Sequence, residues 1–146
     1  MKKMLAILML GALLLGCNKQ PEEPQPTPQP ETPVTSLEER LPGDWELVSI
    51  DGVSPAGLSV WIRFSDKKGF DLWQRSDPTA QFAHFWGTWT LDGDALSGTY
   101  VDGTPWAAAY TVSLKDDRLE LAAGGETSVF RRGTVGADVT DHCYTQ

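Results

Sequence analysis

The segment WIRFSDKKGFDLW, residues 61–73, decides how the middle of this chain folds. Apolar and polar residues alternate on both sides of its turn-forming centre, which is the pattern of a β-hairpin. Folding the segment about its centre brings Phe64 opposite Phe70 on an apolar face. On the other face Arg63 meets Asp71, an opposite-charge pair that cross-strand pairing favours. The two remaining pairs of this register are Ile62 with Leu72 and Trp61 with Trp73.

Two later segments predict hairpins of the same kind. The turn Asp92-Gly93 joins residues 82–91 to residues 95–101, and Asp-Gly suits a hairpin because glycine accepts a positive φ. The turn Asp116-Asp117 joins residues 106–114 to residues 118–123. In both hairpins the period-two alternation places a mostly apolar set of residues on the same face. These residues are Phe85, Gly87, Trp89, Leu91, Leu96, Gly98, Tyr100, Trp106, Ala108, Tyr110, Val112, Leu114, Leu119 and Leu121. The three hairpins agree on a single buried side.

Eight β-type runs follow one another, with turn residues at intervals of about 8 to 12 positions. They are residues 45–50, 58–65, 70–75, 82–91, 95–101, 106–114, 118–123 and 126–132. Consecutive strands with short turns predict an all-β fold, a small eight-stranded up-and-down antiparallel barrel, because closure removes exposed edges. The capping-box pattern of residues 36–39 predicts a short helical turn before it. The barrel domain is therefore placed at residues 36–133.

The buried side of this barrel is rich in aromatic residues. They are Phe64, Phe70, Phe85, Trp89, Tyr100, Trp106 and Tyr110, joined by Trp45 and Phe130. An eight-stranded barrel is either filled by its own side chains or holds one small ligand. The domain's length of about 98 residues favours a filled interior, whereas Gly87 and Gly98, opposed on the inner face, leave room or let the sheet bend. If the interior is open, the candidate ligand contacts are Trp89, Tyr100, Trp106 and Tyr110.

The start of the first strand carries a recognisable motif. The triplet Gly43-Asp44-Trp45 after the helical turn resembles the G-x-W signature of lipocalins and of lipocalin-like bacterial lipoproteins, and residues 87–98 resemble the same family. The resemblance spans residues 41–132. It implies that Trp45 closes one end of the barrel, with Arg132 or its neighbour Arg131 packed on the indole, a reasonable cation–π contact.

The N-terminus has the features of a secretory signal. Lys2 and Lys3 precede an apolar run over residues 4–15, too short for a spanning helix, which needs roughly 20 residues. The run ends in Leu-Leu-Gly-Cys, which resembles the lipobox of bacterial lipoproteins. The resemblance implies a signal peptide over residues 1–16 and acyl chains such as palmitate on Cys17, which would tether the protein to a membrane.

The residues that follow Cys17 bear on its destination. Asn18 stands where, in the enterobacterial pattern, an aspartate retains lipoproteins at the inner membrane. Residues 19–23, KQPEE, look like the signal that sends some lipoproteins to the cell surface. We therefore expect a protein anchored in the bacterial cell envelope at the outer membrane, on its periplasmic or its external side.

Two segments flank the barrel domain. Residues 17–35 contain six of the chain's ten prolines, which favour an extended, semi-rigid linker. Residues 134–146 are expected to form a polar C-terminal tail. Its Cys143 is interpreted as an ordinary tail thiol, with intermolecular pairing as the alternative, because a metal site needs more ligands than this cysteine and the adjacent His142.

Composition and motifs exclude several functions. Without Lys2 and Lys3, 10 basic side chains face 20 acidic ones, which speaks against a nucleic-acid partner. The sequence has no serine elbow, phosphate loop or metal-ligand cluster, and its turn aspartates, Asp66, Asp92, Asp94 and Asp102, do not have calcium-loop spacing. His84, the domain's only histidine, lies on the outer face without an orienting partner. We expect no catalysis, no cofactor and no metal.

Three tryptophans remain on the outer face of successive strands: Trp61, Trp73 and Trp86. Adjacent exposed aromatics usually mark a contact site, although the tail or the helical turn would equally well cover them. Two functions follow. The first is a non-catalytic binding module for a small apolar or sugar ligand. The second is a filled barrel that binds an envelope protein or inhibits a hydrolase through these tryptophans. Catalysis is the least supported function, since only His84 and the inner tyrosines are candidate catalytic residues.

Overall fold

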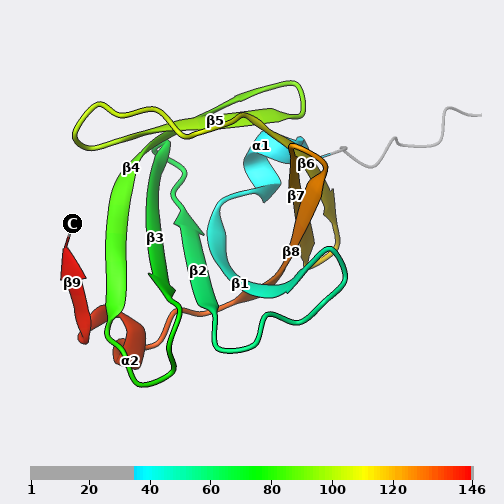
Figure 1. The fold of residues 1–146 in the computed structure, drawn as a ribbon. Coiled ribbons are helices and arrows are strands. Elements are labelled where there is room, and N and C mark those ends of the chain that lie inside the picture. Colours follow the sequence, from blue (N-terminus) through cyan, green and yellow to red (C-terminus); the bar gives the residue numbers. More distant parts are fainter. Residues whose placement is uncertain (1–34, 146) are drawn as a thin grey trace, which may run out of the picture. The chain divides into compact units, whose positions relative to one another are not determined.

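Eight antiparallel strands close into a barrel in the computed structural model, which describes residues 35–145 (Figure 1). The strands are β1 (Gly43–Ile50), β2 (Ser59–Phe64), β3 (Gly69–Arg75), β4 (Phe82–Asp92), β5 (Ala95–Tyr100), β6 (Tyr110–Lys115), β7 (Arg118–Ala123) and β8 (Glu126–Gly133). Each strand pairs with its successor, β1 also pairs with β8, and the ring is complete. The predicted all-β, eight-stranded up-and-down barrel is confirmed.

The predicted hairpin registers are also confirmed. Phe64 pairs with Phe70 and Arg63 with Asp71 in the β2–β3 hairpin. Trp89 pairs with Gly98 across β4 and β5, and the β6–β7 pairs follow the predicted alternation. Apolar alternation fixes these registers because a slip of one residue would turn every side chain to the opposite face.

The predicted strand over residues 106–114 is wrong at its beginning. β6 starts only at Tyr110, and it pairs with β5 at just two positions. Pro105 forms an isolated bridge with Thr99, and residues 106–109 between it and β6 are not part of a strand. Trp106 instead donates its backbone N–H to the carbonyl of Gly98 over 2.9 Å. Ala108, expected on the inner face, is exposed.

One end of the barrel is closed by α1 (Leu37–Arg40) and the residues after it. The predicted capping box forms between Ser36 and Glu39. Trp45 is fully buried and its indole N–H donates to the carbonyl of Leu41 over 2.8 Å. The guanidinium of Arg132 lies 4.2 Å from the centre of the Trp45 ring.

The glycine of this motif has a steric role. Gly43 has φ +133°, a backbone conformation that residues with a side chain rarely adopt. In addition, a Cβ at this position would overlap the guanidinium of Arg132. That guanidinium also donates to the carbonyls of Arg40 and Pro42 over 2.7 and 3.0 Å. Arg132 therefore ties the last strand to the helix that covers this end.

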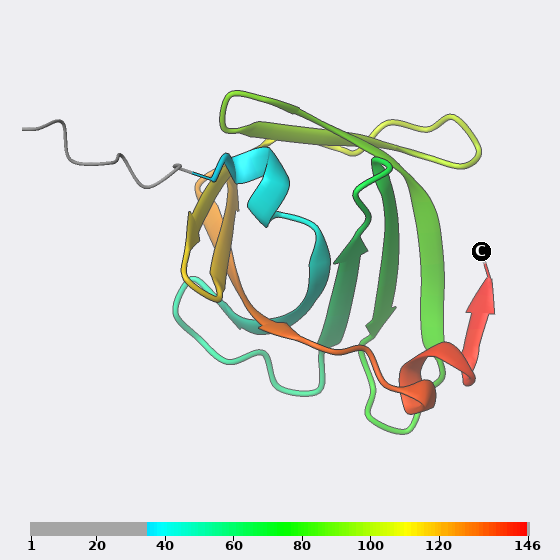
Figure 2. The same ribbon diagram turned by 180° about the vertical axis from the view of Figure 1, so that it is seen from behind.

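The C-terminal segment is part of the fold, and its description as a polar tail outside the domain is wrong. It contains α2 (Ala137–Thr140) and β9 (Cys143–Thr145), and β9 pairs in parallel with the beginning of β4 (Figure 2). Val135 and Val139 bury their side chains against Trp73 and Phe82 on the outside of the barrel. These two apolar side chains and the pairing of β9 with β4 together hold the segment on the barrel.

The predicted signal peptide (1–16), the lipidated Cys17 and all but the last residue of the linker (17–35) lie outside the described residues. Between residues 35 and 145, the helices are too short to span a bilayer.

Candidate ligand-binding cavity

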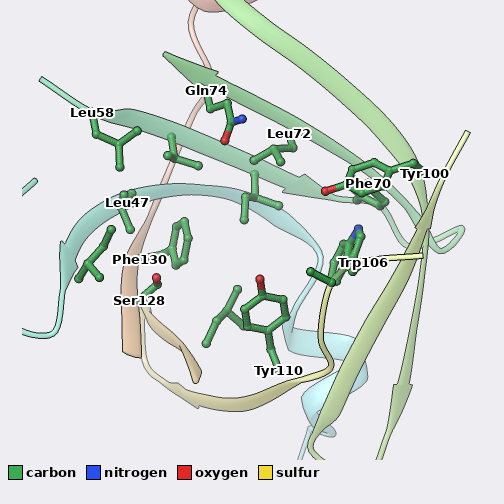
Figure 3. A pocket seen from close by; sticks show the side chains of 15 residues that line it. Leu47, Leu58, Phe70, Leu72, Gln74, Tyr100, Trp106, Tyr110, Ser128 and Phe130 are labelled. Carbon is green, nitrogen blue, oxygen red and sulfur yellow. The ribbon is translucent and has the colours of Figure 1, made fainter. Parts of the chain in front are cut away.

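The barrel contains a partly open cavity of about 280 Å³ at the end opposite α1. β1 begins near α1 at Gly43 and reaches the cavity with Leu47 and Ile50. Most of the lining side chains are apolar: Leu47, Ile50, Leu58, Val60, Ile62, Phe70, Leu72, Trp106, Ala107, Leu121 and Phe130. Figure 3 shows them arranged around a common space. The lining therefore favours an apolar guest.

Aromatic rings form one wall of this cavity. Trp106 lies edge-on to Phe70, with ring centres 4.9 Å apart and planes at 74°. Tyr110 meets Trp106 in the same way at 6.0 Å and 76°, and Tyr100 meets Phe70 at 5.7 Å and 70°. These T-shaped contacts hold the rings in place, because each positive ring edge meets a negative ring face.

Gly98 makes room for this wall. A Cβ on Gly98 would overlap the indole of Trp106, so only glycine permits the ring to lie against β5. At the other inner glycine, Gly87, an added Cβ would overlap the backbone of Thr99 and Tyr100 instead. The two glycines thus accommodate close packing, and they do not themselves create the cavity.

Four polar side chains interrupt the apolar lining: Gln74, Tyr100, Tyr110 and Ser128. The hydroxyl of Tyr110 points into the space (Figure 3). Burial raises the pKa of the Tyr100 hydroxyl, and Tyr110 and Asp102 raise it further, so the group stays protonated at neutral pH. These side chains offer a guest hydrogen bonds in an otherwise apolar space.

None of the side chains that line this cavity is charged. Burying an unpaired charge there would be costly, because the walls provide no counter-charge. The part of a ligand that occupies the cavity is therefore expected to be neutral.

Three of the four predicted interior contacts, Tyr100, Trp106 and Tyr110, line the cavity. Trp89 does not. It is 1% exposed in the filled end, packed edge-on against Phe64 at 5.9 Å, with the Lys68 ammonium 4.0 Å from its ring centre. Gln74 and Ser128 were not foreseen as lining residues, although period-two alternation from Leu72 and Phe130 places both on the inner face.

The outer tryptophans do not form an open patch. Trp73 is 4% exposed beneath Val135 and Val139, and Trp61 packs partly buried against the same cluster. Trp86 is half-buried and stacks on His84 with ring centres 5.2 Å apart. Of the two alternatives, the structure shows the covered one for Trp61 and Trp73.

His84 has the partner that the sequence did not reveal. Its Nε2 lies 2.9 Å from a carboxylate oxygen of Asp71, and its ring stacks on Trp73 at 4.9 Å and 6°. The expectation that nothing pairs with His84 is therefore wrong. The pair lies on the outer face, however, and does not reach the cavity.

The family model of the lipocalin-like domain matches residues 41–121. The chain belongs to this family. Two solved structures share the fold of the lipocalin-like domain, and no curated protein matches the chain. A lipocalin-like protein from Bacteroides uniformis is similar at 21% identity and a TM-score of 0.51, over 64% of this chain and 98% of that one. An uncharacterized protein from Bacteroides eggerthii is similar at 19% identity and a TM-score of 0.50, over 64% and 99%.

Proposed function

We propose that this lipocalin-like domain is a non-catalytic binding module for a small, largely apolar molecule that carries at least one hydrogen-bonding group. The observation that carries this proposal is the cavity of about 280 Å³, with its apolar wall and its inward hydroxyl groups. Small-molecule sites are typically apolar clefts of roughly 300–1,000 Å³ with a few placed polar groups. The cavity lies just below that range, which favours a compact ligand.

The protein-interaction alternative has less support. It requires an accessible tryptophan face, whereas α2 and Val135 cover Trp73. A patch that is already packed against its own chain offers little further apolar area to a partner.

We further propose that Cys17 carries the lipid that holds the domain at the outer membrane, with residues 18–35 as the spacer. This part rests on the sequence pattern alone. Metabolic labelling with an alkyne palmitate analogue tests it, because the label should be incorporated into the wild-type chain and lost in Cys17→Ala. Labelling that persists in Cys17→Ala would contradict the anchor.

Native mass spectrometry tests the binding function. The full-length protein, released from mild detergent inside the instrument, is mixed with the neutral aromatic probe N-phenyl-1-naphthylamine. We expect a 1:1 adduct with the wild type. Ser128→Phe should abolish the adduct, because the new ring occupies the cavity that Ser128 lines.

Thr127→Phe is the matched control. The neighbouring residue points to the outer face of the same strand, so the same substitution leaves the cavity open. Equal occupancy in Ser128→Phe and Thr127→Phe, with both variants folded by near-ultraviolet circular dichroism, would refute the interior site.

A further inference from the structure

One row of side chains crosses the outer face of the barrel and combines charged groups with an aromatic ring. Arg63 of β2 pairs with Asp71 of β3, and Asp71 pairs with Trp86 of β4, so the three residues lie in one line across three strands. Val101 extends the line, because its backbone N–H donates to the carbonyl of Trp86 over 2.9 Å. These four residues are called the outer row.

The C-terminal segment covers the neighbouring tryptophans but stops short of this row. β9 pairs with β4 only at residues 82–84, and α2 lies beside the same end of β4 (Figure 1). In the described part of the chain, the cluster around Val135 and Val139 contains Trp73 but not Trp86. Val101, at the end of the row, is 61% exposed. The outer row is therefore accessible to a ligand.

Asp71 provides a hydrogen-bond acceptor beside the indole of Trp86. Its Oδ1 lies 2.9 Å from Nε2 of His84, and the His84 ring stacks on Trp86 with ring centres 5.2 Å apart. The other carboxylate oxygen, Oδ2, accepts no hydrogen bond from residues 35–145, and 38% of the side chain is exposed. The carboxylate is thus held in position with one oxygen free.

Arg63 provides donors in the same row. Its Nε and Nη2 donate to the two carboxylate oxygens of Asp44 over 2.6 and 3.0 Å, which fixes the guanidinium. Its Nη1 makes no hydrogen bond to the described residues, and 40% of the side chain is exposed. The outer row therefore offers fixed donors and a fixed acceptor next to one aromatic surface.

The charges of this surface disfavour an ionic ligand. Arg63 lies between Asp44 and Asp71 on neighbouring strands. A bound anion would be repelled by Asp71, and a bound cation would be repelled by Arg63, because like charges at contact distance oppose binding. A neutral ligand that both donates and accepts hydrogen bonds avoids both penalties.

The outer row is also unsuited to a protein partner. A standard interface covers about 800 Å² on each protein, and its core is depleted in charged residues. Here one half-buried indole lies beside two charged side chains, and Val101 is the only other apolar member of the row. An area of this size matches a single ring of a small ligand.

We propose that the outer row binds a neutral carbohydrate, with one sugar ring on Trp86 and its hydroxyl groups bonded to Asp71 and Arg63. A sugar ring has an apolar face of C–H groups, whose slight positive charge suits the negative face of an indole. Its hydroxyl groups both donate and accept, and hydrogen bonds to charged groups are the strong ones. Thr88 and Thr99, which pair beside the row, present further exposed hydroxyl groups.

Retention on immobilised glycans tests the proposal. The full-length protein, in a polyoxyethylene detergent that has no sugar head group, is applied to an array of neutral and charged oligosaccharides. We expect retention on neutral glycans, and calorimetric titration then measures the affinity for the best of them. Trp86→Ala should weaken this affinity by about tenfold through the lost aromatic surface. Asp71→Asn should weaken it by about tenfold through the loss of one charged hydrogen bond.

Three control variants make the result specific to the outer row. Asp92→Asn makes the same change at an exposed carboxylate at the far end of β4. Tyr144→Ala removes an aromatic side chain that is 46% exposed on β9. Ser128→Phe fills only the interior cavity. All three should leave the affinity for the sugar unchanged.

The outcomes separate this site from the interior cavity. Retention on no neutral glycan, or on charged glycans alone, would overturn the carbohydrate site. Sugar binding that persists unchanged in a folded Trp86→Ala variant, or that Ser128→Phe abolishes, would overturn it as well, because the sugar would then bind elsewhere. Binding of N-phenyl-1-naphthylamine should be the same in Trp86→Ala as in the wild type, so failure of one site leaves the other standing.

Discussion

Gly98→Ala tests whether the aromatic wall is built by close approach of Trp106 to β5. The alanine Cβ would overlap the six-membered part of the indole, a rigid group with no flexible end to move aside. Trp106 is held in turn by Phe70 at 4.9 Å and by its own backbone bond to Gly98. Overpacking of this kind costs about 1–3 kcal/mol of the free energy of unfolding.

Urea denaturation measures this loss, since the free energy of unfolding falls linearly with denaturant. We expect a lower midpoint with an unchanged slope, and a fall in melting temperature of about 4–8 °C per kcal/mol for a domain of this size. Displacement of Trp106 also moves one wall of the cavity. Binding of N-phenyl-1-naphthylamine should therefore weaken in the same variant.

A double-mutant cycle decides whether the indole is the cause. In a Trp106→Leu background the large ring is gone, so Gly98→Ala should cost much less than it does beside Trp106. If Gly98→Ala costs the same free energy in both backgrounds, the overlap with Trp106 is not its origin and the reasoning about this wall is refuted.

Three further predictions follow from other contacts. Val139→Ala removes buried methyl groups from the contact of α2 with the barrel; it should cost about 1.5–3 kcal/mol and red-shift the tryptophan emission, whereas an unshifted spectrum would speak against docking. The pKa of Asp44 is lowered chiefly by its hydrogen bond with Arg63, so its stabilising effect is full above the ordinary value of 3.8 and is lost as the pH falls below it. Asp44→Asn should flatten the acid limb of the stability curve, and an acid limb as steep as that of the wild type would contradict this. Arg132→Met should destabilise the domain by about 1.5–3 kcal/mol through its lost charged hydrogen bonds and its contact with Trp45, and a thermal melt that matches the wild type would be inconsistent with that role.

Local hairpins were predictable because their residues carry two independent signals. In the β2–β3 hairpin the apolar alternation and the Arg63–Asp71 pair point to the same register, and turn residues mark where the chain reverses. Agreement between the two faces excludes the neighbouring registers, since a shift of one residue exchanges the faces and a shift of two separates Arg63 from Asp71.

The contacts that were missed join residues far apart in the sequence. The β3–β4 connection has no tight turn, so the sequence did not reveal that Trp73 lies opposite His84 and that Asp71 reaches the histidine ring. The parallel pairing of β9 with β4 was equally hidden, because three residues carry no recognisable period. Val135 and Val139 look like isolated apolar residues until the outer tryptophans are placed beneath them.

The barrel is filled at one end of its axis and hollow at the other. At the α1 end the strands contribute bulky inward side chains, among them Trp45, Phe64 and Trp89, and these are at most 1% exposed. At the other end, small or polar side chains such as Val60 and Ser128 stand opposite the aromatic wall and do not fill the space in front of it. Close packing requires side-chain volume to match the enclosed space, so the same strands fill one end and leave the other hollow. The sequence contained this difference, but it becomes visible only when the direction of each strand relative to α1 is known.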